Sequence, residues 1–285
     1  MERIDDRHVF WNFKGAGEYS DQKFLMSTPF VITAIVVLYL WFVIKFGPEL
    51  MKKRPPFKLE KVLLVYNAVQ VMISCYIFQL GFRFLINNGM WNTRCLSETE
   101  EFRKQVVDGS HYYFLAKVVE LLDTVFFVLR KKQKQVTFLH VYHHAMMASL
   151  VWAIVKYNRT DITVFLGVIN SLVHVVMYGY YGLSVFPSLT KYLWWKKYIT
   201  MMQLIQFSLM FIHTIVTHMV SECRPSEALL ITVCFNTVLF MYLFGDFYVK
   251  SYIKKYNRKD IVNAGKVISN STNVTNYHKL AMKIH

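Results

Sequence analysis

The chain contains seven apolar segments, each of about 18 residues or more and poor in charged side chains. A helix of that length crosses the hydrocarbon core of a bilayer, where each backbone polar group must be bonded within its own segment. Of the 285 residues, 54% are hydrophobic and 16% aromatic, which is too apolar for an ordinary soluble domain. The sequence therefore predicts an all-α membrane protein with seven transmembrane helices, at approximately residues 29–46, 61–86, 112–129, 136–156, 162–183, 198–220 and 227–249.

The basic residues are distributed unevenly between the two ends of these predicted helices. The formal net charge is +15, and lysines and arginines cluster in alternate connections and in the C-terminal tail, at Lys52, Lys53, Arg54, Lys58, Arg130, Lys131, Lys132, Lys134, Lys191, Lys196, Lys197, Lys250, Lys254, Lys255, Arg258 and Lys259. Seven crossings place all of them on one side of the membrane, and such an excess is typical of the cytosolic side. We therefore expect a lumenal or external N-terminus, a cytosolic C-terminus and no nucleic-acid partner.

The segments outside the predicted helices are short. Some 27 mostly polar residues precede the first apolar segment, with no basic region followed by a small-residue cleavage site. The first segment is therefore expected to remain a helix and not to be removed as a signal peptide. We expect a lumenal segment at 1–28, a seven-helix transmembrane domain at 29–250 and a cytosolic tail at 251–285.

Two of the four cysteines, Cys95 and Cys223, fall in connections assigned to the non-cytosolic side, where disulfides persist. A bridge between these two is the preferred pairing, and two free thiols are the alternative. The tripeptide Asn158-Arg159-Thr160 forms a glycosylation sequon on the same side, very close to the membrane.

The fourth apolar segment carries three histidines within one helical turn, in the sequence His140-Val141-Tyr142-His143-His144. The spacings i, i+3 and i+4 place the three rings on one face of a helix. Ionisable side chains inside a bilayer are costly, and they normally face the interior of a bundle or a water-filled cavity. The three histidines therefore indicate a functional site.

Polar residues also form stripes at helical spacing in the third, fifth and sixth segments. The third has Lys117, Glu120, Asp123 and Thr124; the fifth has Asn170, His174, Met177, Tyr178 and Tyr181; the sixth has Thr200, Gln203 and Gln206. A lipid-facing surface does not accept an unpaired lysine or aspartate, so we expect the stripes to meet in a shared interior. For Thr200, Gln203 and Gln206 a purely interhelical role stays equally open. Lys117 is expected to form an ion pair with Glu120 or Asp123. One interpretation is that this pair has a structural role and also shapes the site.

The histidines lie near the cytosolic start of their helix, so we expect the chemistry in the cytosolic half of the membrane, beneath the basic connections. A polar centre between an apolar interior and a basic rim fits an amphiphile with an apolar tail and an anionic head, such as a fatty acyl thioester of coenzyme A. The basic connections alone fit contacts with anionic lipid equally well.

Two classes of membrane enzyme use an HxxHH pattern. Di-iron desaturases and hydroxylases bind metal through many histidines from several boxes, whereas only four cluster here, at His140, His143, His144 and His174. The other class uses neutral imidazole as a nucleophile or general base. A metal-dependent fatty acyl desaturase or hydroxylase stays as the alternative. A transporter is less favoured, because the sequence shows no pair of helices broken by glycine and proline.

Four motifs in order resemble the very-long-chain fatty acid elongases of the endoplasmic reticulum. They are Lys117-x-x-Glu120-Leu121-x-Asp123-Thr124, His140-x-x-His143-His144, His174-x-x-Met177-Tyr178-x-Tyr180-Tyr181 and Thr200-x-x-Gln203-x-x-Gln206. The resemblance extends from about residue 25 to 260 and includes the stretches LRKKQKQVTFLHVYHH and LFGDFY. Gln135, five residues before His140, resembles the pattern of those branches of the family that act on longer or unsaturated acyl chains.

The resemblance implies a condensing enzyme that joins acyl-CoA to malonyl-CoA and forms a 3-ketoacyl-CoA, CO2 and CoA, with no metal or other cofactor. It implies six helices surrounding a narrow tunnel closed at its lumenal end, an endoplasmic reticulum membrane location, and a homodimer and other elongation-cycle enzymes as candidate partners. The dibasic retention signal of the family is only partly present, because Lys283 is third from the end but Met282 and Ala281 precede it.

The same resemblance suggests roles for individual residues. His143 is expected to attack the thioester and hold the acyl group, with a role as base alone as the variant. His144, His174 and Asn170 would move protons or stabilise an enolate oxygen, and His140 would orient its neighbours. Substrate-binding candidates are Lys117, Glu120, Asp123, Tyr178, Tyr181, Gln203 and Gln206 near the histidines, and Arg130, Lys131, Lys132, Lys196 and Lys197 at the CoA phosphates.

Overall fold

The computed structural model describes residues 18–91, 94–96, 98–158, 160–221, 223 and 225–253. Helices account for nearly all of this part of the chain, and its only β-type pairing is an isolated bridge between Cys95 and Thr160. Most of the predicted segment 1–28 lies outside the described residues. The basic tail residues Lys254, Lys255, Arg258 and Lys259, the tail residue Lys283 and sequon residue Arg159 lie outside them as well.

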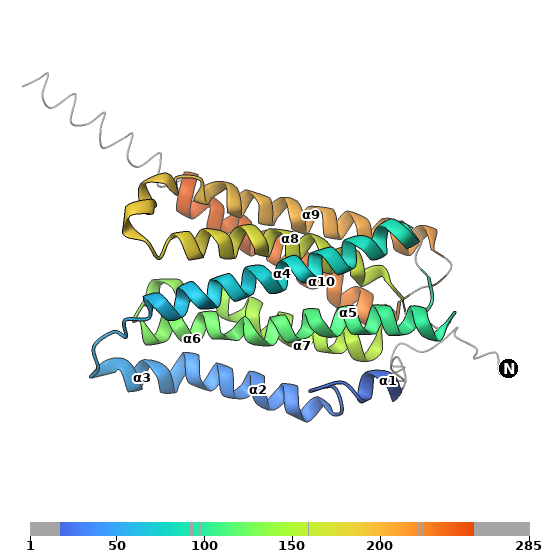
Figure 1. Cartoon of the computed structure of the whole chain (residues 1–285), viewed down its shortest axis with the longest axis horizontal. Coiled ribbons are helices and arrows are strands. Elements are labelled where there is room, and N and C mark those ends of the chain that lie inside the picture. The colour runs from blue at the N-terminus through green and yellow to red at the C-terminus, as the bar shows by residue number, and fades with distance from the viewer. Residues whose placement is uncertain are drawn as a thin grey trace, which may run out of the picture. The chain divides into compact units, whose positions relative to one another are not determined.

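The helices follow one another with short connections (Figure 1). They are α1 (Glu18–Asp21), α2 (Pro29–Trp41), a π-helical turn (Phe42–Phe46), α3 (Gly47–Lys52), α4 (Glu60–Asn88), α5 (Glu100–Val119), α6 (Leu121–Leu129), a 3-10 turn (Gln133–Gln135), α7 (Phe138–Tyr157), α8 (Ile162–Leu183), a 3-10 turn (Pro187–Tyr192), α9 (Lys196–Val220), α10 (Glu227–Tyr248) and a π-helical end (Val249–Ile253). Residues up to Met241 form one compact unit, and a second begins at Tyr242. In the second unit Asp246 and Lys250 form an ion pair of 2.7 Å.

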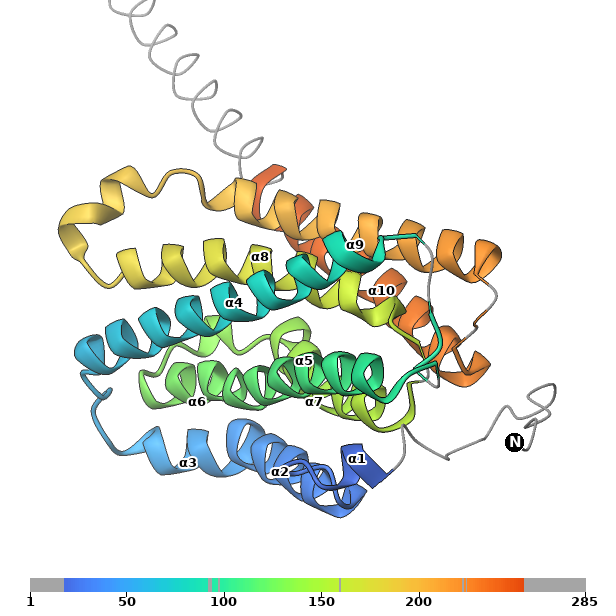
Figure 2. The same cartoon turned by 45° about the vertical axis from the view of Figure 1, so that its right-hand side comes forward.

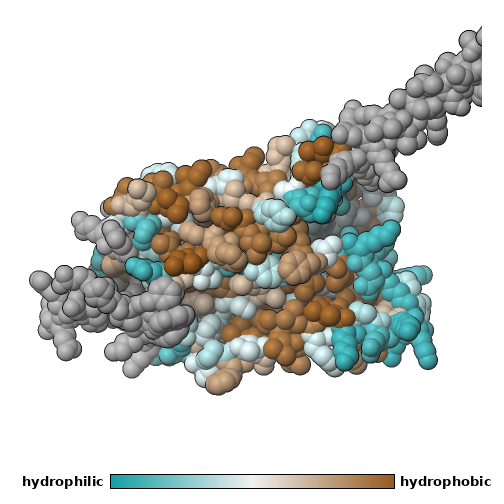
Figure 3. All heavy atoms as spheres, turned by 180° about the vertical axis from the view of Figure 1, so that it is seen from behind, coloured by the Kyte–Doolittle hydropathy of each residue, from teal (hydrophilic) through white to brown (hydrophobic). Residues whose placement is uncertain are grey.

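Six helices or helix runs of the described chain are long and apolar enough to cross a membrane. They are Pro29–Lys52, Glu60–Asn88, Phe138–Tyr157, Ile162–Leu183, Lys196–Val220 and Glu227–Ile253. The protein is therefore a multi-pass membrane protein, and these six agree closely with predicted segments. Figure 3 shows brown, apolar side chains across the middle of one face and teal, hydrophilic side chains gathered at its right-hand end.

The expected seventh span at 112–129 is not found as one apolar helix. The chain there forms two helices, α5 and α6, which meet at Glu120. Lys117, Glu120 and Asp123 place three charged residues in the middle of the predicted span, whereas each of the six helices contains an 18-residue window with at most two. Helix α5 also begins at Glu100, twelve residues before the predicted start, because Thr99 caps it by accepting a hydrogen bond of 3.2 Å from the Phe102 amide.

The connections in which several basic residues cluster lie at one end of the first unit. The α3–α4, α6–α7 and α8–α9 connections all appear at the left in Figure 1, and the α4–α5, α7–α8 and α9–α10 connections lie at the right. The charge asymmetry read from the sequence is therefore a difference between the two ends of the helix bundle. Below, we call these the basic end and the opposite end.

Close helix packing holds the unit together along its length. Helices α4 and α8 run side by side in both views, and α2 packs on the other side against α7 (Figures 1 and 2). Gly81 of α4 lies against Val168 and Val164 of α8, where a Cβ atom would come within 2.4 Å of Val168 Cγ2. Small residues allow such close backbone approach between membrane helices.

The opposite end is tied by covalent and polar contacts. Cys95 and Cys223 form a disulfide with a Cα–Cα distance of 5.5 Å, the pairing preferred from the sequence. Asp161 accepts a hydrogen bond of 2.9 Å from the Arg94 amide, and His213 Nε2 donates one of 2.8 Å to the Met90 carbonyl. These contacts join the α4–α5, α7–α8 and α9–α10 connections.

The sequon residue Asn158 lies at this end with its side chain only 3% exposed. Its amide nitrogen donates hydrogen bonds to the Thr160 carbonyl and to Thr163 Oγ1. An N-linked glycan would replace one of these hydrogens and needs space outside the protein. The folded structure therefore disfavours glycosylation at Asn158.

The α4–α8 contact predicts opposite effects for two glycine substitutions. We expect Gly81→Ala to lower stability by about 1–3 kcal/mol, because its methyl group overlaps Val168. Gly179→Ala is the matched control on α8: nothing lies within 4 Å of an added Cβ there, and alanine favours a helix over glycine by about 1 kcal/mol. Thermal unfolding of detergent-solubilised protein measures both, and equal shifts would contradict the close packing.

A second expectation concerns pH. Burial raises the pKa of the Asp161 carboxyl to about 6, and the hydrogen bond from the Arg94 amide only partly offsets this effect. The unfolded carboxyl titrates near about 3.9, so the stability that the protonated form contributes is present below that pH and is lost as pH rises through about 6.

Asp161→Asn keeps an oxygen acceptor for Arg94 and removes this titration. We expect its unfolding temperature to rise relative to wild type between about pH 5 and about pH 7.5. Glu101→Gln, at an exposed acid on α5, serves as the control and should track wild type at both pH values. A constant difference between Asp161→Asn and wild type would contradict the assignment.

Candidate active site

A buried lysine is the centre of the polar interior. Lys117 Nζ donates to both Glu120 carboxylate oxygens at 3.0 Å, to Asn170 Oδ1 at 2.8 Å and to His174 Nε2 at 3.4 Å. Each of these four side chains belongs to a residue that is at most 6% exposed. A charge buried in this way is tolerated only when it is paired and its hydrogen bonds are satisfied. The α5–α6 stripe and the α8 stripe therefore meet, as the sequence predicts.

The contacts of His174 assign the proton on its ring. An ammonium group only donates hydrogen bonds, so Nε2 must accept from Lys117. The proton of the neutral ring is then on Nδ1, which lies 3.1 Å from Glu120 Oε1. His174 is thus held between a cation and a carboxylate.

The amide of Asn170 is oriented by two donors. Lys117 Nζ and Tyr113 OH both donate to its Oδ1, at 2.8 and 2.7 Å. Its NH2 group points away from them, toward Gln206 Oε1 at 3.5 Å. Because amide oxygen and nitrogen are assigned from such networks, the two donors fix which side of Asn170 can donate.

The histidines of α7 do not all face the same neighbour. The His140 and His144 rings are 4.4 Å apart, and His144 Nε2 lies 3.9 Å from Asp123 Oδ2, which also accepts a hydrogen bond of 2.7 Å from Tyr178 OH. His143 instead contacts Phe240 of α10 at 4.8 Å between ring centroids. The three histidines of this helical turn therefore face two directions. His140 and His144 face α6, and His143 faces α10.

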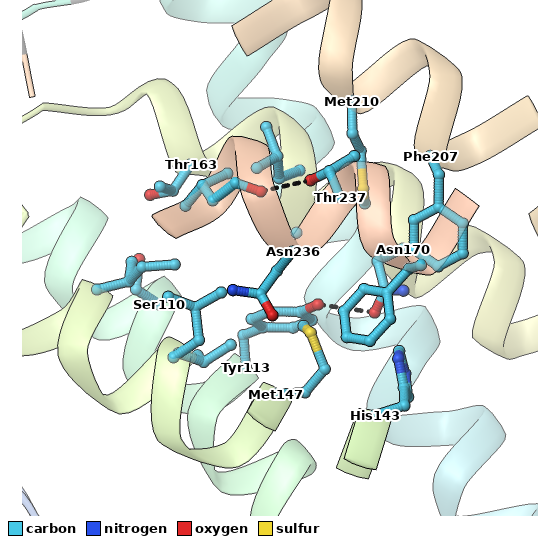
Figure 4. Close-up of a pocket in the computed structure, with 17 residues that line it drawn as sticks. Ser110, Tyr113, His143, Met147, Thr163, Asn170, Phe207, Met210, Asn236 and Thr237 are labelled. Atoms are coloured by element: carbon cyan, nitrogen blue, oxygen red, sulfur yellow. Dashed lines mark hydrogen bonds between the residues drawn. The ribbon is translucent and has the colours of Figure 1, made fainter. Parts of the chain in front are cut away.

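His143 opens into a cavity of about 70 Å³, which we call the histidine-side cavity. Its polar lining includes Tyr113, Asn170 and Asn236, and its apolar lining includes Met147, Leu150, Ile154, Phe207, Met210, Val233 and Phe240. In Figure 4 the His143 ring points toward Asn170, and Ser110 and Thr163 lie at the far side of the cavity. His143 and the Asn170 amide therefore line the same cavity, whose wall is mostly apolar with a few polar groups.

The remaining candidates lie at graded distances from this centre. Gln206 bonds to Asn170, whereas Gln203 donates to the sulfur of Met177 at 3.6 Å and Tyr181 stacks edge-on against Tyr178, with ring centroids 6.2 Å apart. The expected CoA-binding residues lie at the basic end, after α6 and at the start of α9: Arg130, Lys131, Lys132, Lys196 and Lys197.

Sequence reasoning missed two lining residues. Tyr113 is four residues before Lys117 and continues its stripe by one turn, so helical spacing could have found it. Asn236 is an isolated amide in α10, and its Oδ1 accepts a hydrogen bond of 3.0 Å from Tyr142 OH. A single amide side chain in an otherwise apolar span is the sequence feature that could have identified Asn236 as a lining residue.

Among the residues that the structure describes, no three histidine, cysteine, aspartate or glutamate side chains are arranged to hold one metal ion. His140 Nε2 is buried and has no hydrogen-bond partner within this part of the chain. The four imidazoles are instead held by aromatic contacts, Asp123, Lys117 and Glu120.

The chain is similar in sequence to known proteins over most of its length. The ELO: GNS1/SUR4 family matches residues 24–260. Very long chain fatty acid elongase 7 of Drosophila melanogaster is 39% identical over 235 residues, which cover 81% of this chain and 71% of that protein. Very long chain fatty acid elongase 4 of Homo sapiens is 37% identical over 273 residues, covering 94% and 85%. Very long chain fatty acid elongase 2 of Mus musculus is 38% identical over 236 residues, covering 81% and 78%.

These similarities do not favour the desaturase alternative. They agree with the resemblance carried by the four motifs, and they extend over most of each chain. The protein belongs to the ELO: GNS1/SUR4 family.

Proposed function

We propose that the protein is an enzyme of fatty acid elongation that condenses a long-chain acyl-CoA with malonyl-CoA. The observation that carries the proposal is His143, which faces an apolar cavity beside the Lys117–Asn170–His174 cluster in a chain of this family. The cavity suits an acyl chain, and the cluster suits a thioester carbonyl that gains negative charge.

In the first half-reaction an imidazole nitrogen of His143 attacks the thioester carbonyl carbon. The carbon–sulfur bond breaks, an acyl-imidazole forms, and the proton lost from the imidazole ends on the CoA thiol. Asn170 can donate its NH2 group to the developing oxyanion, because Lys117 and Tyr113 hold its carbonyl oxygen on the other side.

In the second half-reaction malonyl-CoA loses CO2, and the carbon–carbon electron pair becomes an enolate. The enolate carbon attacks the acyl-imidazole carbonyl, and the carbon–nitrogen bond to His143 breaks. The imidazole takes up one proton from solution, so the products are 3-ketoacyl-CoA, CO2 and CoA. His174, between Lys117 and Glu120, is placed to relay protons through the same cluster.

The proposed reaction implies an orientation in the membrane. The α5–α6 pair would form the seventh crossing, and six helices would surround the tunnel. The basic end would face the cytosol in the endoplasmic reticulum membrane, with Arg130, Lys131, Lys132, Lys196 and Lys197 at the CoA phosphates. The N-terminus would then be lumenal, where the Cys95–Cys223 disulfide persists.

The covalent step is tested by intact mass spectrometry after incubation with a long-chain acyl-CoA and no malonyl-CoA. We expect wild type to gain the mass of one acyl group and to release it as 3-ketoacyl-CoA when malonyl-CoA is added. His143→Ala should gain no mass and lose turnover.

His218→Ala is the matched control, because His218 lies on α9 near the opposite end and lines neither the cluster nor the cavity. It should form the adduct as wild type does. Normal product formation without any adduct would leave His143 as a base only, and absence of condensation with every acyl-CoA would overturn the proposed function.

The two-donor arrangement at Asn170 gives a separate expectation. Tyr113→Phe removes one hydrogen bond to Oδ1 and should lower kcat by about three- to thirty-fold, with little change in the acyl-CoA KM. Tyr192→Phe is the control, because Tyr192 is exposed in the 3-10 turn Pro187–Tyr192 and does not line the histidine-side cavity. A Tyr113→Phe enzyme with wild-type kcat would show that Tyr113 does not position the amide.

A further inference from the structure

The described part of the first unit contains a second, larger cavity beside the histidine-side cavity. It has a volume of about 380 Å³ and lies between α4, α5 and α8. We call it the side chamber. Its apolar wall includes Ile77, Leu80, Phe84, Val106, Val164 and Val168.

Four residues line both spaces: Ser110, Tyr113, Thr163 and Gly167. Three of them are small, and nothing lies within 4 Å of a Cβ atom added at Gly167. Ser110 and Thr163 are on the side of the histidine-side cavity away from His143 (Figure 4). The side chamber therefore begins where the histidine-side cavity ends.

The volumes show why an acyl chain would need both spaces. A cavity of about 150 Å³ holds one benzene molecule, and the histidine-side cavity has less than half that volume, about 70 Å³. A long acyl chain attached at His143 has no room to end there. The side chamber adds about 380 Å³ directly beyond the shared residues.

We propose that the side chamber holds the methyl-terminal part of the acyl chain, which passes from His143 between Ser110, Tyr113, Thr163 and Gly167 toward α4. The inference rests on the proposed function. It adds to the narrow tunnel that the family resemblance implies, because the acyl chain would turn toward the gap between α4 and α5. Tyr76 and Tyr112 border this gap, with ring centroids 5.8 Å apart and both rings partly exposed.

Photo-crosslinking tests where the end of the chain lies. A long-chain acyl-CoA with a diazirine at its methyl end is bound to the full-length enzyme without malonyl-CoA, irradiated, and mapped by peptide mass spectrometry. We expect adducts on α4 at Ile77, Leu80 or Phe84. Because the described lining of the histidine-side cavity comes from α5, α7, α8, α9 and α10, adducts on α4 identify the side chamber.

Two controls separate the chamber from the outer surface and from failure of the enzyme. Excess unlabelled acyl-CoA must abolish the adducts on Ile77, which is 7% exposed, but not any on Met72, which is 62% exposed. Adding malonyl-CoA must convert the probe to product. Adducts confined to Leu150, Ile154, Met210 or Val233 would overturn the side-chamber proposal while leaving the proposed function intact, whereas an unconverted probe would count against the function itself.

A filling variant gives an independent readout. Leu80 lines the side chamber and is not among the described residues that line the histidine-side cavity. Leu80→Trp therefore adds bulk to the side chamber alone. We expect the ratio of kcat/KM for the longest accepted acyl-CoA to that for the shortest to fall at least tenfold. An unchanged ratio, including an equal loss with all chain lengths, would overturn the proposal.

Discussion

The pairing of one buried lysine organises the centre of this protein. Lys117 lies in a helix bundle surrounded by apolar spans, and its charge is balanced by Glu120 and bonded to Asn170 and His174. These partners come from the α5–α6 junction and from α8. The Lys117 ammonium group therefore has its counter-ion and all its hydrogen-bond acceptors only when those segments are side by side. Helix α5 ends at Val119, directly before Glu120, and the cluster sits at that junction.

The rest of the fold supplies the rigidity that such a cluster needs. Gly81 brings α4 against α8, and the Cys95–Cys223 disulfide joins two connections at the opposite end. The site lies on helices and not on loops, which keeps donors and acceptors within hydrogen-bond distance. The two adjoining cavities are spaces between the same helices, so the elements that position the polar groups also shape the path of an apolar chain.

Much of the site could be predicted because membrane burial makes polar residues conspicuous. Helical spacing identified the three histidines of α7, the stripe that contains Lys117 and the stripe that contains Asn170 and His174. The structure brings these three groups together. The prediction of one continuous span at 112–129 is not confirmed, because Lys117, Glu120 and Asp123 put three charged residues into that segment and the helix divides at Glu120. Tyr113 was missed although it continues the Lys117 stripe by one turn, and Asn236 was missed because a single amide in a helix does not reveal its partner.

The sequence by itself determined an all-helical membrane protein, the uneven charge at the two ends, and the candidate residues of the site. It could do so because apolar length and helical periodicity are local properties, and a bilayer permits few alternatives to a helix. Only the tertiary structure decided that His143 faces the cavity while His144 faces Asp123. It also decided that Lys117 and Tyr113 both donate to Asn170 Oδ1, and where the two cavities meet. These depend on how each helix is rotated and displaced against its neighbours, which is set by side-chain packing between segments far apart in the chain.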